Sequence, residues 1–393
     1  MTPFIQDWLN LLIRWAHFVA GIMWIGSSFY FVWLDSSFEK PKEEEKGVDG
    51  ELYMVHGGNF YRVEKRRFGA GEMPQNLHWF KWEATFTWIT GFLLLIVTYY
   101  LGSSSYLFDS TQSSLSVGEA RFLGISLLAG SWFFYDALFR LKISDRPWFN
   151  FVGLSFLAAL IYVLTHFFSG RGAFIHLGAI YGTMMVLNVW VHILPNQRAI
   201  IDASLAGREP NYDLGKKAKR RSMHNSYMTL PVLFMMISNH FPSTYAHRSN
   251  GLILVLFIVL GAFVRHYMIT LKKKFLVPAF VALGTLISMT AQVHSTRKSH
   301  NEGLEPVRSS QVMVIIKTRC TQCHASNPSD DEITIAPNDL IFESIEQVQA
   351  ASSKIYERVV LLKNMPLNNK TKITEDERDL LGRWIEEGAK KSD

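Results

Sequence analysis

The stretch Cys320-Thr321-Gln322-Cys323-His324 decides how the rest of the chain must be arranged. Two thiols three positions apart can each add across a haem vinyl group, and the following histidine is placed to ligate the iron. This C-x-x-C-H spacing therefore indicates covalent attachment of a c-type haem. A structural zinc site needs four ligands, and the chain has no third cysteine. Because such haem is attached on the outer face of the cytoplasmic membrane, the motif predicts on which side this end of the chain lies.

The segments around the motif are typical of a small class I cytochrome c. Residues 308–319 predict a short helix that leads into Cys320, and Thr374 with Glu377 forms a capping box for a last helix. Between them lies Met365, followed by proline, and its thioether is a soft sixth ligand that raises the potential of a haem. The alternative is a loop methionine that fills space in the core. We predict the ligand role.

Upstream of this region the chain is dominated by long apolar runs. A hydrocarbon core of about 30 Å needs roughly 20 helical residues, and isolated strands would leave backbone groups unpaired in lipid. The first run lacks a preceding basic region, so we interpret it as a retained helix and not as a signal peptide. The sixth run is short and contains Pro231. The expected spans are eight, at about residues 11–34, 84–101, 122–139, 149–168, 173–194, 226–241, 251–270 and 276–294.

Lys and Arg are unevenly distributed between the segments that connect these spans. The segments after the first, third, fifth and seventh spans carry 22 of them, whereas the N-terminus and the segments after the second, fourth and sixth carry 3. By the positive-inside rule the first group is cytoplasmic, so the N-terminus is periplasmic. Eight spans return the chain to the periplasm, where the C-x-x-C-H motif must lie. The formal charge of +6 thus marks topology and predicts no nucleic-acid partner.

The predicted fold class is all-α. A polytopic membrane helical bundle of about eight spans occupies residues 1–295, a polar linker occupies 296–310, and a small class I cytochrome c domain occupies 311–393. The lipid bilayer is therefore an expected partner of the first part.

Two histidines near the outer ends of spans are candidates for a second haem. Ionisable residues inside a membrane are costly, so each is a functional candidate. His17 shares a helix face with Gly21, Trp24 and Ser28, which suits the approach of a flat macrocycle. His176 occupies a related place in the second half of the bundle. Either the two histidines ligate a haem b, or each hydrogen-bonds a neighbouring helix.

Three residues near the inner ends of spans are candidates for acid–base catalysis. Glu83 and Asp136 form a possible carboxylate pair, and His192 lies near them in the predicted topology. General acid–base chemistry uses such groups in a water-poor site. The alternative is that they lie at helix ends and reach the interface. The aromatic and basic loop 35–82 is long for a simple connection, and it has the residues to bind a planar anion by stacking and charge.

The whole chain resembles the membrane-bound bacterial urate oxidases (urate hydroxylases) that carry a C-terminal cytochrome c domain. The resemblance rests on the eight expected spans and on three stretches, which are Arg14-Trp15-Ala16-His17-Phe18-Val19-Ala20-Gly21-Ile22-Met23-Trp24-Ile25-Gly26, His78-Trp79-Phe80-Lys81-Trp82-Glu83-Ala84 and Cys320–His324. It implies oxidation of urate to 5-hydroxyisourate, with electrons leaving through the cytochrome and no hydrogen peroxide released. Only the haem ligands carry over by motif, as Cys320, Cys323, His324 and Met365.

The resemblance also implies partners and a location. The substrate would be urate, the electron acceptor an external cytochrome or a terminal oxidase, and the site the bacterial cytoplasmic (inner) membrane with both termini periplasmic. The competing hypothesis is a quinol-linked cytochrome c reductase or a membrane-anchored electron-transfer cytochrome. A simple carrier needs one anchor helix, so the many expected spans argue against it.

Overall fold

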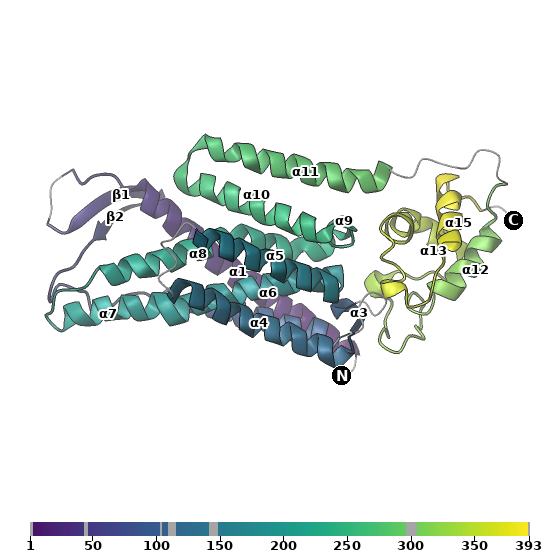
Figure 1. The fold of residues 1–393 in the computed structure, drawn as a ribbon, viewed down its shortest axis with the longest axis horizontal. Coiled ribbons are helices and arrows are strands. Elements are labelled where there is room, and N and C mark those ends of the chain that lie inside the picture. The colour runs from purple at the N-terminus through teal and green to yellow at the C-terminus, as the bar shows by residue number, and fades with distance from the viewer. Residues whose placement is uncertain are drawn as a thin grey trace.

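The computed structural model describes residues 3–42, 46–102, 104–108, 115–140, 148–295 and 305–391. Long helices lie side by side in an elongated bundle, and a smaller helical unit sits beyond one end of it (Figure 1). We call residues 305–391 the tail. The end of the bundle next to the tail is its proximal end, and the opposite end is its distal end.

Each predicted span falls largely within a helical segment of the bundle, although α1 begins eight residues and α8 thirteen residues before the predicted span. α6 is its centre, because it packs against α2, α4, α5 and α8 and contributes the fully buried Phe174 and Leu177 to the main hydrophobic cluster. The helices are α1 (Pro3–Ser37), α2 (Trp82–Leu95) with η1 (Ile96–Tyr100), α3 (Ser104–Leu107), α4 (Val117–Arg140), α5 (Trp148–Phe167), α6 (Gly170–Leu187) with η2 (Asn188–Ile193), α7 (Leu194–Leu205), α8 (Asp213–Ile237) with η3 (Ser238–His240), α9 (Pro242–Tyr245), α10 (Asn250–Thr270), η4 (Lys273–Phe275) and α11 (Leu276–Ser295).

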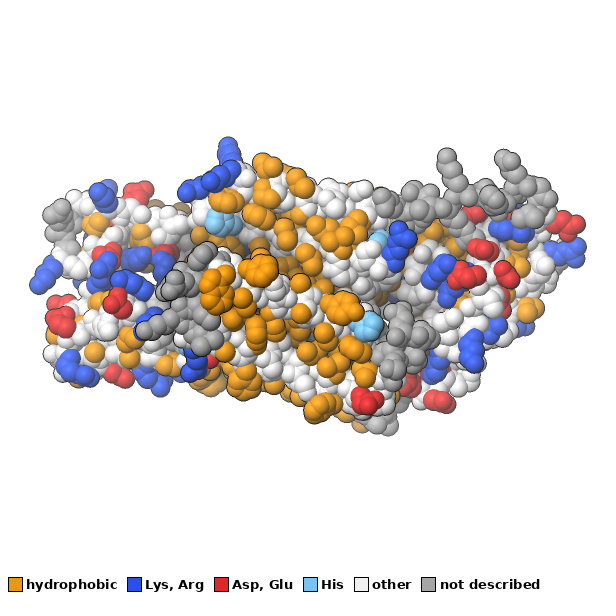
Figure 2. Space-filling model, viewed as in Figure 1, with side chains coloured by type: hydrophobic (Ala, Val, Ile, Leu, Met, Phe, Trp, Pro, Cys, Tyr) orange, Lys and Arg blue, Asp and Glu red, His pale blue; other side chains and the backbone are white. Residues whose placement is uncertain are grey.

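Seven helices in the described residues are long and apolar enough to cross a membrane. Apolar side chains gather over the middle of the bundle, whereas charged side chains gather at the distal end and on the tail (Figure 2). The predicted sixth span, 226–241, falls mostly in α8, which packs against α6 and α10 but is not among the seven. The first half of α8 contains Lys216, Lys217, Lys219, Arg220 and Arg221, and this charge accounts for the difference. That α8 also crosses the membrane, which would make eight spans in all, stays a prediction.

A β-hairpin at the distal end corrects the all-α prediction. β1 (Val48–His56) and β2 (Asn59–Arg66) pair antiparallel inside the loop 35–82. Gly57 and Gly58 form the connection, both with positive φ, which a two-residue hairpin turn favours and which glycine adopts without strain. The rest of the described fold is mainly helical.

The tail has its own hydrophobic cluster, separate from that of the bundle. Its first and last helices match the predicted ones, and Thr374 and Glu377 form the expected capping box. Most of the predicted linker, 296–304, lies outside the described residues. The elements are α12 (Ser309–Arg319), η5 (Pro337–Asp339), α13 (Ile345–Ala350), α14 (Ser352–Ile355), η6 (Tyr356–Leu361), η7 (Leu367–Asn369) and α15 (Glu375–Glu386).

Hydrogen bonds join the tail to the proximal end of the bundle. The amide of Asn368 donates to the backbone oxygens of Ser105 (3.1 Å) and Phe108 (2.8 Å). Arg358 donates to the hydroxyl of Tyr245 at 3.2 Å. We call these contacts the seam. Since Asn368 follows Met365 by three residues, the seam places the methionine loop next to the bundle.

Candidate functional site

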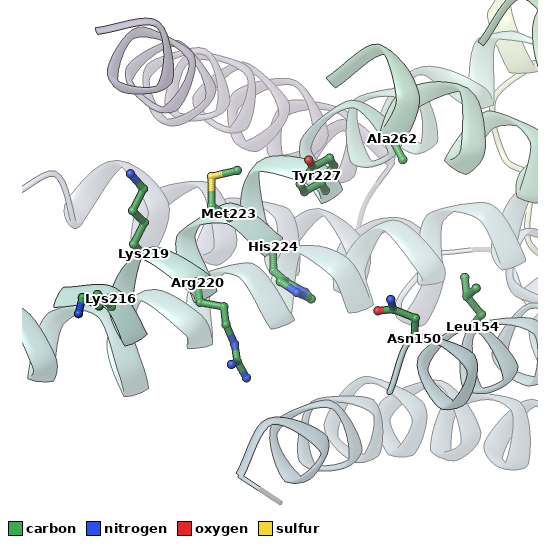
Figure 3. A pocket seen from close by; sticks show the side chains of 9 residues that line it. All are labelled: Asn150, Leu154, Lys216, Lys219, Arg220, Met223, His224, Tyr227 and Ala262. Atoms are coloured by element: carbon green, nitrogen blue, oxygen red, sulfur yellow. The ribbon is translucent and has the colours of Figure 1, made fainter. Parts of the chain in front are cut away.

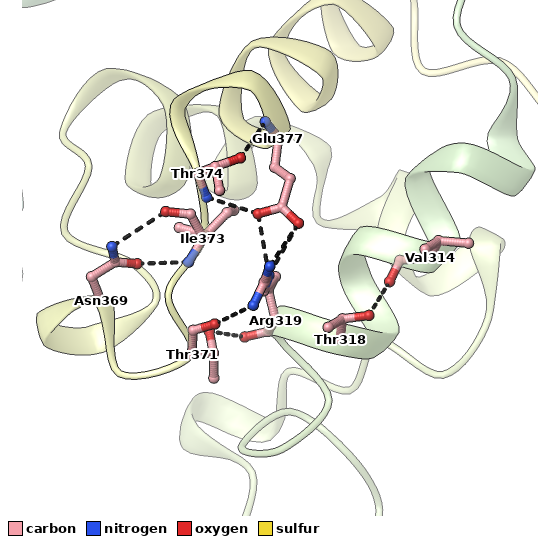
Figure 4. Close-up of polar contacts among 8 residues, drawn as sticks. All are labelled: Val314, Thr318, Arg319, Asn369, Thr371, Ile373, Thr374 and Glu377. Carbon is pink, nitrogen blue, oxygen red and sulfur yellow. Dashed lines mark hydrogen bonds and ion pairs between the residues drawn. The ribbon is translucent and has the colours of Figure 1, made fainter.

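The five-residue motif lies at the end of α12, held in place by the helix that closes the tail. Arg319, which precedes Cys320, binds both oxygens of Glu377 and donates to the backbone oxygen of Thr371 at 2.6 Å (Figure 4). Glu377 also accepts from the backbone N–H of Thr374, the N-cap of α15. The capping box therefore fixes where α12 ends and where the two thiols begin.

The residues of the motif fit a c-type haem. Cys320 and Cys323 are free thiols, and burial raises their pKa to about 12 and about 11, so both are protonated at neutral pH. The Nδ1 of His324 lies 2.8 Å from the backbone oxygen of Leu340. An Nδ1–H that donates to a carbonyl leaves the Nε2 lone pair for a metal, which is the usual arrangement of a ligating histidine.

Met365 is held on both sides by backbone contacts. Its N–H donates to the oxygen of Arg358 at 3.1 Å, and its own oxygen accepts from Arg378 at 2.7 Å. The side chain is partly buried and packs against the hydrophobic cluster of the tail that also contains Cys320. Its position is compatible with the predicted role of sixth ligand.

A second polar site lies inside the distal half of the bundle, around Asp136 of α4. Arg221 of α8 donates to its Oδ1 at 2.7 Å, His192 of η2 contacts Oδ1 at 2.5 Å, and Arg140 donates to Oδ2 at 2.5 Å. Asp136 is only 6% exposed. The guanidinium of Arg221 also lies 4.0 Å from the centre of the Phe139 ring. We call this group the Asp136 network.

Amide side chains complete the Asp136 network. Asn188 accepts from Arg221 at 3.2 Å and donates to Asn225 (2.8 Å) and to the hydroxyl of Tyr135 (3.0 Å). Asn188 begins the π-helix η2, which widens the helix where these contacts form, and π-bulges are frequent at functional sites. The buried polar atoms of this network therefore have partners, as a stable buried cluster requires.

The network brings together two of the three predicted catalytic residues. Because Asp136 is bound by two guanidinium groups, its carboxylate is a poor base and instead orients His192. With Nε2 directed to Asp136, neutral His192 has its lone pair on Nδ1, which can accept a proton. The structure does not bring Glu83 into this group. Glu83 lies in the first turn of α2, and its Oε2 is buried without a hydrogen-bond partner among the described residues.

His17 and His176 lie at different levels of the bundle. The Nδ1 of His17 contacts the oxygen of Thr87 and the hydroxyl of Thr90, each at 3.0 Å. His176 is fully buried, with Nδ1 near the oxygen of Gly172 (2.8 Å) and Nε2 near the hydroxyl of Tyr100 (3.0 Å). The two rings meet different turns of α2–η1, and both nitrogens of His176 lie within hydrogen-bond distance of other groups. A haem b between the two histidines stays a prediction.

A basic pocket of about 810 Å³ opens between α5, α8 and α10 in the distal half (Figure 3). Lys216, Lys219, Arg220 and His224 line it, and none of the described residues that line it is acidic. The ring of His224 lies 4.6 Å from that of Phe139, which also stacks on Arg221, so the pocket adjoins the Asp136 network. Such a positive concavity attracts anions. Among the described residues, no group of three or more His, Cys, Asp or Glu side chains could hold a metal ion.

Sequence analysis did not identify the partners of Asp136 in the Asp136 network. Arg221 was counted only as one of several basic residues that mark the cytoplasmic side. Its signal was the spacing to Asn225, four residues later, which puts an arginine and an amide on one face of α8. Asn188 is a polar residue inside an apolar run, but its bond to Arg221 depends on the packing of α6 against α8.

The bundle and tail together define a largely helical protein with apolar helices of membrane-spanning length and buried titratable groups. A family model described as urate oxidase N-terminal matches residues 3–296, and the chain belongs to this family. Membership in this family suggests that the protein is an oxidoreductase and that the oxidation it carries out is related to urate. No curated protein and no solved structure gives a significant match.

Proposed function

We propose that the protein is an integral membrane oxidase that converts urate to 5-hydroxyisourate and passes the electrons to a haem c in its tail, without releasing hydrogen peroxide. One observation supports this most directly. A body of the urate oxidase N-terminal family and a tail whose Cys320, Cys323, His324 and Met365 fit a haem c are joined in one chain. The tail is then a small class I cytochrome c domain.

The location that we propose is the bacterial cytoplasmic membrane. The apolar middle of the bundle and its seven long apolar helices support it, with α8 as the eighth crossing. The Lys- and Arg-rich segments lie at the distal end, which we therefore assign to the cytoplasm. α1 begins at the proximal end, beside the tail, so both ends of the chain are periplasmic in this assignment (Figure 1).

The reaction balances as urate plus water giving 5-hydroxyisourate, two electrons and two protons. Haem c bound at Cys320, Cys323, His324 and Met365 would accept electrons one at a time and pass them to an external cytochrome or a terminal oxidase. The protons need a base near the substrate. His192 Nδ1, oriented by Asp136, and the unpaired oxygen of Glu83 are the groups that can serve.

The experiment uses the full chain purified in detergent, without oxygen. We expect urate to produce the absorption bands of ferrous haem c. A pyridine haemochrome spectrum then counts haem c and any haem b, and so decides whether a second centre is present. Reduction by a quinol but not by urate would instead favour a quinol-linked cytochrome c reductase. Replacing Cys320 and Cys323 by alanine should abolish covalent haem, whereas replacing Met365 by alanine should leave it attached with a changed potential.

A further inference from the structure

One face of α8 forms much of the lining of the basic pocket, and its chemistry changes along the helix. The residues of this face recur three or four positions apart, so their side chains lie in one row. They are Lys216, Lys219, Arg220, Met223, His224 and Tyr227. The row therefore begins with three cations at the distal end and continues with a thioether and two rings closer to the middle of the bundle (Figure 3).

The walls that α5 and α10 contribute are mainly apolar. Leu154 of α5 and Ala262 of α10 line the pocket together with Asn150. α5 begins at Trp148, so Leu154 lies only about 9 Å further along its axis. Trp148 is 48% exposed, and tryptophan is enriched where a membrane meets water. The pocket thus lies where the charged distal end of the bundle passes into its apolar middle (Figure 2).

The pocket opens outward because α5 and α8 pack against different parts of α10. α10 meets α5 at Gly251, where an added Cβ would lie 3.5 Å from the side chain of Thr165, whereas it meets α8 at Gly261. Toward the distal end a gap is left between α5 and α8, and the pocket fills it. Phe151 and Leu154 of α5 are 72% and 65% exposed, so this side of the bundle would meet lipid in the proposed location.

The two lysines of the pocket have partners that a ligand can replace. Lys216 pairs with Asp213 at 2.8 Å, and Lys219 pairs with Asp35 at 2.8 Å. All four side chains are at least 41% exposed, and ion pairs between exposed groups contribute little to stability. A phosphate group therefore competes for these lysines without breaking a buried contact.

We propose that the basic pocket binds one anionic phospholipid of the cytoplasmic leaflet. Its phosphate would lie at Lys216, Lys219 and Arg220, and the first part of an acyl chain would lie against Leu154 and Ala262. The order of charge and apolar surface along the pocket matches that of a lipid molecule, and basic pockets between membrane helices on the cytoplasmic side bind anionic headgroups.

Two features of the pocket favour this ligand over related ones. None of its described lining residues is acidic, so it has no group to pair with the ammonium of a zwitterionic headgroup. A free phosphate would meet the same cations but would leave the apolar wall of a pocket of about 810 Å³ uncovered. The inference rests on the proposed membrane location and not on the proposed reaction.

The experiment compares three probes on the full chain, purified and stripped of lipid in an uncharged detergent. They are dioleoylphosphatidylglycerol, dioleoylphosphatidylcholine, which has the same chains, and glycerol phosphate, which has none. Binding is followed as the rise in the thermal unfolding midpoint and as lipid retained in mass spectrometry of the intact protein. We expect phosphatidylglycerol to raise the midpoint and to stay bound as one molecule, and the other two probes to do neither.

Matched variants test which residues hold the lipid. Lys216→Gln combined with Arg220→Gln should weaken the binding of phosphatidylglycerol at least about tenfold. Lys217→Gln combined with Arg208→Gln removes the same charge from exposed residues outside the pocket and should bind as the parent does. Ala262→Phe keeps every charge but fills the apolar end of the pocket, and it should also weaken binding.

Several outcomes would overturn the inference. Equal stabilisation by phosphatidylcholine would show a lipid coat without selectivity, and equal stabilisation by glycerol phosphate would show a site for free anions. Displacement of the lipid by urate would assign the pocket to the substrate. Equal losses in the two double variants would show an effect of net charge alone. Reduction of the haem by urate is measured on the same samples, so failure of the proposed reaction is recognised separately from failure of the lipid site.

Discussion

Two groups of buried charge lie in the bundle, and they differ in whether their polar atoms are satisfied. In the Asp136 network a carboxylate is bound by Arg221, Arg140 and His192. At Glu83, Arg121 and Arg265 one buried atom of each side chain has no hydrogen-bond partner among the described residues. The first group is complete without a ligand, whereas the second is not.

This difference indicates that buried charged side chains, which cost free energy to desolvate, have two different roles in the bundle. A buried charge is tolerated when opposite charge and hydrogen bonds surround it, and such a network holds its helices in register. A buried polar atom without a partner needs another physical reason, such as a ligand, an ordered water or strain. The comparison predicts that removing a charge has opposite effects on stability in the two groups.

The largest effect should come from Asp136→Asn. The variant leaves Arg221 buried without its carboxylate, and breaking a buried pair in this way costs about 3–5 kcal/mol. We expect a clear fall in the thermal unfolding midpoint of the purified chain. An unchanged midpoint would remove the distinction between the two groups.

The next effect should have the opposite sign. Arg265→Gln removes a buried charge that has no counter-ion in the part of the chain that the structure describes, and replacing buried ionic groups can stabilise a protein by about 1–4 kcal/mol. Without urate, the unfolding midpoint of this variant should equal or exceed that of the parent. A loss of stability as large as that of Asp136→Asn would show that Arg265 has a structural counter-ion.

A smaller effect is expected at the seam, where the amide of Asn368 is satisfied by two carbonyl oxygens. Asn368→Asp leaves a side chain of the same size but replaces the amide donor by a carboxylate oxygen, which cannot donate to those oxygens. We expect the free energy of docking between the tail and the bundle to weaken by about 1–3 kcal/mol. Asparagine and aspartate both tolerate its positive φ of 50°. We expect faster hydrogen exchange in residues 104–108 and slower reduction of the haem by urate. Asn338→Asp, at a tail residue of similar φ (55°), is the control and should change neither.

The smallest expected effect is the loss of stability of the tail at acidic pH. Burial alone would raise the pKa of Glu377, but hydrogen bonds from Thr374 and the ion pair with Arg319 hold it below the ordinary 4.5. A carboxyl group whose pKa is lower in the folded than in the unfolded state stabilises the fold above about pH 4.5. This stabilisation is lost as the pH falls through the pKa of the folded state. Thermal unfolding of the tail, followed by haem absorption, should therefore lose stability below pH 4.5. In Glu377→Gln this part of the pH dependence should be missing.

Local sequence patterns predicted those parts of the fold that depend on few residues. Apolar length located the long helices, and the Thr374–Glu377 spacing located the start of α15. The hairpin was missed although Gly57-Gly58 between alternating residues was a signal for it, because the loop was interpreted only by its charge and aromatic content. Pro231 did not end α8, since close packing against Gly261 of α10 supports the helix there.

The sequence by itself determined the haem-type motif, the apolar helices and the asymmetry of charge, because each is contained in neighbouring residues or in the composition of one segment. Only the tertiary structure decided which buried charges meet. Asp136, His192 and Arg221 come from three helices, and Glu83 and Arg265 from two others. Their partners depend on helix rotation and depth, which periodicity does not specify, and so whether a charge is satisfied or open is known only after the helices are packed.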